Sequence, residues 1–128
     1  MSVLVETLHF EQGPLTFSAQ AVGSGPIVLC LHGFPDNAGS FSYQLPALAD
    51  AGYRALSLTL RGYEPSSIPA DGDFSIEAVA GDVVTLIRAL DAGPVHLIGH
   101  DWGAAVGYNA AADAPECFRS LTTIAVPH

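Results

Sequence analysis

The run Gly99-His100-Asp101-Trp102-Gly103 holds a carboxylate between two glycines, where a short apolar segment meets an alanine-rich one. This spacing is the small-x-nucleophile-x-small pattern of a nucleophile elbow, a tight turn from strand to helix that lifts its middle side chain above the sheet. Glycines suit the flanking positions because the turn leaves no room there for a Cβ atom. An Asp at a helix start can instead cap the helix, but the glycines on both sides favour a nucleophile.

A carboxylate nucleophile at Asp101 would attack a saturated carbon and leave an alkyl ester on the protein. Water must then attack the ester carbonyl, and the resulting oxyanion needs hydrogen-bond donors. One donor is expected from the backbone N–H of Trp102, and the other from the loop after the third strand. That loop follows the apolar run Ile27–Leu31. The backbone N–H of Phe34 is the expected second donor, since Pro35 has no N–H and only fixes the backbone.

The elements that must position these residues alternate between strand-like and helix-like runs, which is typical of a parallel sheet with helices on its faces. The first two strands are expected to form an antiparallel hairpin and the other four to run parallel. The predicted fold class is therefore α/β with a six-stranded, mostly parallel sheet. The clearest helix begins after Ser75 as N-cap and stops before Gly93-Pro94. The predicted strands are 3–10, 15–22, 27–31, 53–60, 95–98 and 120–126, and the predicted helices are 40–51, 75–91 and 104–114.

Composition limits the class of protein. The chain has 128 residues, 49% hydrophobic and 13% charged, which predicts a single domain over 1–128 and excludes a disordered chain. Four basic residues stand against 13 acidic ones, for a formal net charge of −9, so no nucleic-acid or anionic-membrane surface is expected. Two cysteines, Cys30 and Cys117, are too few for a disulfide framework, and Cys30 is expected to be a buried thiol.

The sequence shows no targeting or cofactor-binding pattern. The first ten residues lack the basic region of a signal peptide, and the apolar runs are shorter than the ~18–20 residues of a membrane span. No cluster of His, Cys and acidic residues has the spacing of metal ligands, and no glycine-rich phosphate-binding loop is found. We therefore expect a soluble cytoplasmic protein that needs no cofactor or metal.

Three motifs together resemble the epoxide-hydrolase and haloalkane-dehalogenase branch of the α/β-hydrolases. They are His32-Gly33-Phe34-Pro35-Asp36, Arg61-Gly62-Tyr63 and the elbow at 99–103. They occur in the order and spacing of that branch and span nearly the whole chain. The resemblance implies that Asp101 is the nucleophile and that the backbone N–H groups of Phe34 and Trp102 form the oxyanion hole. It also implies that Phe34, Pro35 and Trp102 line the substrate pocket, with a cis bond between Phe34 and Pro35.

Within that branch, two residues bear on the substrate. Phe34 favours an epoxide, because haloalkane dehalogenases usually carry a polar, halide-binding residue at this position. Fluoroacetate dehalogenases also have Phe there, but they have Arg after the nucleophile, where this chain has Trp102. The expected substrate is a small apolar epoxide, and the alternative is a haloalkane dehalogenase-like hydrolase acting on a halogenated compound.

The sequence departs from that branch in two respects. Thr59 stands where an Asp usually precedes Arg61 by two residues, which we interpret as a change in local hydrogen bonding. The family's catalytic acid, its general-base His and its cap with two epoxide-activating tyrosines follow the strands present here. His128 lies after the last strand, where family members often have a His with no base role. The chain alone is therefore expected to be inactive or to react once, and a non-catalytic truncated or engineered module is the other class that stays open.

The resemblance also predicts how the strands are ordered and what the last one does. A truncated α/β-hydrolase fold without a cap would have the strand order 1-2-4-3-5-6, with the sixth strand at the edge. An exposed parallel edge over 121–126 invites pairing with another chain. We therefore expect a homo-oligomer, most simply a two-fold dimer joined near the sixth strand, or else pairing with a complementary C-terminal chain.

Overall fold

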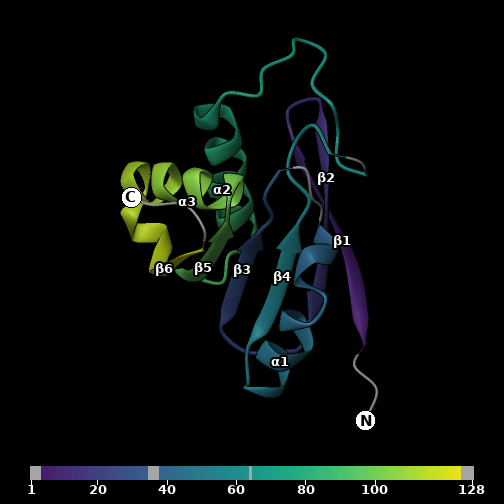
Figure 1. Ribbon diagram of the computed structural model, residues 1–128, viewed down its shortest axis with the longest axis vertical. Coiled ribbons are helices and arrows are strands. Elements are labelled where there is room, and N and C mark those ends of the chain that lie inside the picture. The colour runs from purple at the N-terminus through teal and green to yellow at the C-terminus, as the bar shows by residue number, and fades with distance from the viewer. Residues whose placement is uncertain (1–3, 35–37, 64, 125–128) are drawn as a thin grey trace.

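The computed structural model describes residues 4–34, 38–63 and 65–124 and contains one six-stranded sheet in the order β1-β2-β4-β3-β5-β6 (Figure 1). The strands are β1 (Val5–Gln12), β2 (Leu15–Val22), β3 (Ile27–Leu31), β4 (Arg54–Leu58), β5 (Val95–His100) and β6 (Phe118–Ile124). The helices are α1 (Gln44–Asp50), α2 (Ile76–Leu90) and α3 (Trp102–Asp113), with 3₁₀ turns at Ala38–Phe41 and Pro115–Cys117. The predicted fold class and strand order are confirmed.

The sheet is mixed, as expected from the opening hairpin. β1 pairs with β2 and β2 with β4 in antiparallel fashion. β4, β3, β5 and β6 then run parallel to one another. The carboxyl ends of these four parallel strands lie at the same edge of the sheet, so the loops that follow β3, β4 and β5 meet there. This is the edge where ligand sites form in open α/β sheets.

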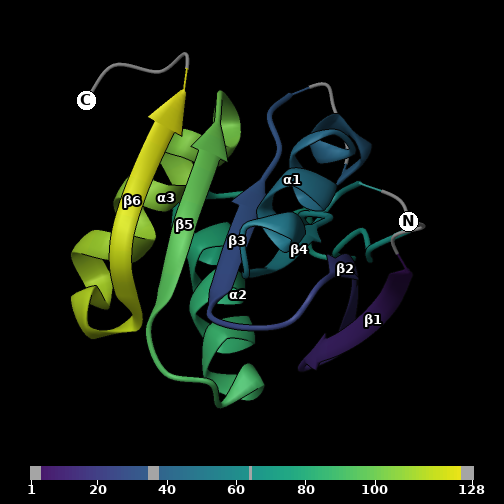
Figure 2. The same ribbon diagram turned by 90° about the horizontal axis from the view of Figure 1, so that it is seen from below.

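Helices cover both faces of the sheet, with α1 on one face and α2 and α3 on the other (Figure 2). This explains the continuous apolar run of β3, since a strand buried on both faces has no polar side. Leu29 and Leu31 pack on the side of α2 and α3, whereas Val28 and Cys30 pack on the side of α1. Cys30 is fully buried, as predicted, and burial raises the pKa of its thiol to about 12.

Several element boundaries differ from the sequence-based ones, for local reasons. The predicted helix 40–51 is a 3₁₀ turn followed by the shorter α1, in which Pro46 lies in the first turn, the part of a helix that tolerates a missing N–H. α3 begins at Trp102 rather than at 104, because the elbow turns within one residue. β6 begins two residues earlier than predicted, and its predicted end at Val126 lies outside the described residues.

The helix with the clearest sequence pattern forms almost as predicted. Ser75 is the N-cap of α2, and its hydroxyl accepts a hydrogen bond from the backbone N–H of Ala78 at 3.2 Å. The helix ends at Leu90, and the C-cap residue Asp91 adopts the left-handed conformation with φ +49°. None of the helices in the described part of the chain is long and apolar enough to cross a membrane.

Candidate active site

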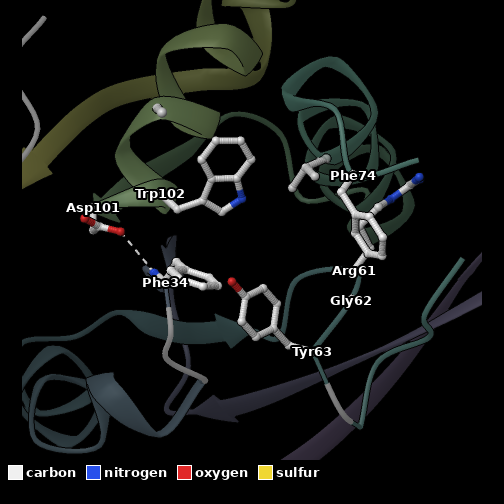
Figure 3. A pocket seen from close by; sticks show the side chains of 9 residues that line it. Phe34, Arg61, Gly62, Tyr63, Phe74, Asp101 and Trp102 are labelled. Atoms are coloured by element: carbon white, nitrogen blue, oxygen red, sulfur yellow. Dashed lines mark hydrogen bonds between the residues drawn. The ribbon is translucent and has the colours of Figure 1, made fainter. Parts of the chain in front are cut away.

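Asp101 occupies the sharp turn between β5 and α3, where the sequence placed the elbow. Its backbone has φ +55° and ψ −117°, a conformation that residues other than glycine rarely adopt. Backbone strain of this kind costs on the order of 1–3 kcal/mol and persists where the surrounding structure enforces it. The turn directs the Asp101 side chain toward the carboxyl edge of the sheet, next to the loop that follows β3 (Figure 3).

Two glycines allow the three backbone segments of the site to approach one another. A Cβ atom on Gly103 would lie 2.3 Å from the carbonyl oxygen of Leu31, so the first turn of α3 could not rest on the end of β3. A Cβ atom on Gly33 would lie 2.6 Å from the Cβ of Asp101. The loop after β3 therefore reaches the elbow only because both positions lack a side chain.

The Asp101 carboxylate faces backbone donors from both segments. The N–H of Phe34 donates a hydrogen bond to Oδ2 of Asp101 at 3.0 Å (Figure 3). This bond and a second one from the backbone N–H of Trp102 lower the pKa of Asp101 below its ordinary value. Asp101 is therefore an ionised carboxylate at neutral pH. The two N–H groups that the sequence predicted as oxyanion-hole donors are the two that hold it.

His32 holds the loop that carries Phe34. It is fully buried, and its Nε2 accepts a hydrogen bond from the backbone N–H of Leu60 at 3.1 Å. In the neutral ring the proton is therefore on Nδ1, and this N–H donates a hydrogen bond to the carbonyl oxygen of Gly33 at 2.9 Å. The ring also meets Tyr63 edge to face, with centroids 4.8 Å apart. His32 is thus a satisfied structural histidine that joins the loops after β3 and β4.

An open cleft of about 620 Å³ lies in front of Asp101. Aromatic side chains dominate its wall, and two of them, Phe34 and Phe74, are 70% and 47% exposed. The predicted pocket residues Phe34 and Trp102 line the cleft (Figure 3). The third, Pro35, and the bond expected to be cis lie outside the described residues. The full lining is Phe34, Arg61, Gly62, Tyr63, Phe74, Val79, Asp101, Trp102 and Ala105.

A buried ion pair supports the far wall of this cleft and was not predicted. Arg61 donates to both carboxylate oxygens of Asp82 in α2, from Nε at 2.6 Å and from Nη2 at 2.7 Å. Its Nη1 donates to the carbonyl oxygen of Asp73 at 2.9 Å. The hydrogen bond with Asp82 raises the pKa of Arg61, while burial raises the pKa of Asp82 against the opposing effect of the guanidinium. The sequence does hold a signal for this pair: Asp82 is an acidic residue on the buried face of α2, with Val79 and Val83.

The histidines do not supply a base to Asp101 within the described part of the chain. None of them lines the cleft. His96 is hydrogen-bonded to the hydroxyl of Ser120 at 2.7 Å, and His100 is half-buried next to the elbow. His128 lies outside the described residues. Among residues 4–34, 38–63 and 65–124, no group of three or more His, Cys, Asp or Glu side chains could hold a metal ion.

A mixed sheet in this strand order, with an elbow after β5 and a facing loop after β3, defines an α/β-hydrolase. The family model described as alpha/beta hydrolase fold matches residues 26–128, and the chain belongs to this family. Among curated relatives, an epoxide hydrolase of Caballeronia sordidicola is 42% identical over 106 residues, 82% of this chain and 32% of the relative. The bifunctional epoxide hydrolase 2 of Sus scrofa is 40% identical over 107 residues, 83% of this chain and 19% of the relative.

Solved structures agree with the sequence relatives. The crystal structure of an epoxide hydrolase from Vigna radiata matches with a TM-score of 0.92 and 36% identity, over 97% of this chain and 41% of that one. The chain therefore spans less than half the length of each of these proteins. The predicted resemblance to the epoxide-hydrolase branch of the family is confirmed.

Proposed function

We propose that this chain carries the nucleophilic half of an epoxide-hydrolase reaction. The observation that supports this most is the ionised Asp101 carboxylate, held by the backbone N–H groups of Phe34 and Trp102 beside an aromatic cleft. A carboxylate oxygen of Asp101 forms a bond to an epoxide carbon while the bond between that carbon and the epoxide oxygen breaks. The products are an ester on Asp101 and an alkoxide, which takes up a proton.

The same backbone donors suit the second half-reaction. When water adds to the Asp101 ester, negative charge develops on its carbonyl oxygen, and preorganised N–H groups stabilise such an oxyanion. That step also needs a general base to take a proton from the water. Because no histidine lines the cleft among the described residues, we propose that the base comes from elsewhere. The chain alone would then form the ester and hydrolyse it very slowly.

The test is the intact mass of the chain after incubation with styrene oxide, a small apolar epoxide. We expect one equivalent of adduct on the parent chain and none on the isosteric Asp101→Asn variant. Multiple turnovers to the diol without an accumulating adduct would mean that the nucleophile works and a base is supplied. A parent chain that yields neither adduct nor diol would contradict the proposal and favour a non-catalytic role for the elbow.

A haloalkane dehalogenase-like activity is the second candidate, and it is favoured by the Trp102 indole, which lies in the cleft near Asp101. An indole N–H is a donor that can bind a departing halide. Against this, the neighbouring Phe34 offers only an apolar side chain. Release of halide from a primary haloalkane, with no adduct or diol from styrene oxide, would select this activity over the first.

We also propose that β6 pairs with a second copy of the chain. Within the described residues β6 pairs only with β5, so its other side is an open edge, and Ile124 near its end is 48% exposed. Open parallel edges are sites of strand addition. Light scattering at micromolar concentration should give the mass of a dimer that dissociates on dilution. A monomer at every concentration would contradict this, and a complex formed only with an added C-terminal chain would identify that chain as the partner.

A further inference from the structure

Phe74 is a large apolar residue that stays 47% exposed, although the backbone on both sides of it is held in place. Before it, the carbonyl oxygen of Asp73 accepts a hydrogen bond from Nη1 of the buried Arg61 at 2.9 Å. After it, the backbone N–H of Ser75 donates to Oδ1 of Asp73 at 3.1 Å, and Ser75 is the N-cap of α2. The exposed ring is therefore anchored to a buried ion pair and to the start of a helix.

The ring of Phe74 is also fixed by its contact with Gly62 in the loop after β4. A Cβ atom on Gly62 would lie 2.5 Å from Cε1 and 2.9 Å from Cδ1 of Phe74. The ring therefore rests against this backbone only because the position has no side chain. The same ring lines the cleft in front of Asp101. Packing thus sets where this aromatic wall stands, and a bound molecule is not needed to order it.

Phe74 lies on the far side of the cleft from the nucleophile. Figure 3 shows Asp101 at one side and Phe74 at the other, with Phe34 and Trp102 between them. The elbow and the loop after β3 meet at Asp101, where the N–H of Phe34 donates to the carboxylate. An epoxide that presents a carbon to Asp101 therefore extends its substituent away from that junction. A substituent that stays within the cleft passes between the rings of Phe34 and Trp102 and reaches Phe74.

The charges around the cleft favour an uncharged substituent at the far side. Arg61 is the only cationic side chain among the described residues that line it. Its guanidinium points away from the centre of the cleft (Figure 3) and is bonded on three nitrogens to Asp82 and Asp73. A carboxylate or phosphate on the substrate would find no available cation there and would face the negative charge of Asp101. An aryl group suits the ring of Phe74 better, since aromatic rings pair in stacked or edge-to-face arrangements.

We propose that Phe74 is a specificity-determining residue that binds the aryl substituent of an epoxide while Asp101 attacks the ring carbon. This assignment rests on the proposed function, because the attack by Asp101 places the substituent. Phe74 is remote from the carboxylate and from the bond that forms. Its contact with the substrate is therefore the same before and during the attack. A contact of this kind lowers the concentration needed for half-saturation and leaves the limiting rate unchanged.

The test compares two epoxides that offer the same unsubstituted terminal carbon to Asp101. Phenyl glycidyl ether carries an aryl substituent, and propylene oxide carries only a methyl group. The rate of ester formation on Asp101 is followed by intact mass over a range of concentrations of each epoxide. Phe74→Ala should lower the second-order rate constant for phenyl glycidyl ether about tenfold relative to that for propylene oxide, the upper end of the contribution of an aromatic pair. The loss should appear in the half-saturating concentration of phenyl glycidyl ether.

Two further variants show whether the ring itself is responsible. Phe74→Leu keeps an apolar side chain without the aromatic face, and it should lower the ratio of the two rate constants less than Phe74→Ala does. Tyr43→Ala is the matched control, because Tyr43 is 87% exposed and lies outside the cleft. It removes an aromatic ring and should leave the ratio unchanged.

The outcomes separate this assignment from the proposed function. An unchanged ratio in Phe74→Ala, or equal losses with both epoxides, would overturn the assignment while leaving Asp101 as the nucleophile. A loss confined to the limiting rate would overturn it as well, because it would mean that Phe74 acts on the bond-forming step. A parent chain that reacts with propylene oxide alone would also overturn it. No adduct on the parent with either epoxide would overturn the proposed function itself.

Discussion

Replacing Gly103 with alanine is expected to lower the free energy of unfolding by about 3 kcal/mol, the upper end of the usual cost of overpacking. The added Cβ would lie 2.3 Å from the carbonyl oxygen of Leu31 and 2.7 Å from that of His32. Both atoms belong to the backbone of β3 and the loop after it, so no side chain can move aside. α3 would have to move away from the sheet and take the elbow with it. Urea unfolding followed by far-ultraviolet circular dichroism measures the loss.

Gly81 provides the matched control for this substitution. It lies within α2, and a Cβ added there meets no atom within 4 Å. Alanine has the higher helix propensity, so Gly81→Ala should raise the free energy of unfolding by roughly 0.5–1 kcal/mol. The two glycine-to-alanine changes are therefore expected to have opposite signs. A Gly103→Ala variant that is as stable as the parent would show that α3 does not pack on β3 as closely as described.

The second large effect is expected at the buried pair of Arg61 and Asp82. Asp82→Asn keeps the shape of the side chain but removes the charge opposite a guanidinium that is only 9% exposed. Loss of one partner from a buried pair costs about 3–5 kcal/mol, because the other charge stays buried without compensation. Chains of this size are stable by only about 5–15 kcal/mol. The variant should therefore show a much lower urea midpoint than the parent.

The chain contains an exposed ion pair that serves as the control. Arg88 and Glu116 are 3.3 Å apart, with side chains 64% and 66% exposed. Exposed pairs contribute about 0–1 kcal/mol, so Glu116→Gln should be nearly neutral under the same conditions. If Asp82→Asn cost no more than Glu116→Gln, the pair would not support the wall of the cleft. A double variant, Arg61→Met with Asp82→Leu, should recover much of the stability, since no unpaired charge remains.

Much of the fold could be predicted because its signals are local. The apolar run of β3 shows a strand buried on both faces, and the glycines around Asp101 show a turn with no room for side chains. The backbone donors of Phe34 and Trp102 followed from the position of their segments beside the elbow, and the structure places both next to the Asp101 carboxylate. Their roles as an oxyanion hole remain a prediction.

Other features of the site depend on contacts between distant segments, which periodicity does not reveal. Arg61 and Asp82 are 21 positions apart and meet only because the loop after β4 folds against α2. Phe74 and Tyr63 enter the cleft for the same reason. The sequence marked Tyr63 as part of a motif, but its place against His32 in the wall of the cleft comes from the fold.

The central claim is that Asp101 itself is the nucleophile, and locating the adduct tests it most directly. The parent chain would be treated with styrene oxide at neutral pH, denatured, digested and sequenced by tandem mass spectrometry. Asp91 and Asp113, which lie on either side of Asp101 in the sequence, serve as internal references because they lie outside the cleft. We predict that the added mass resides on Asp101 alone and that native folding is required for it. A label on Asp91, Asp113 or a histidine, with Asp101 unmodified, would contradict the account.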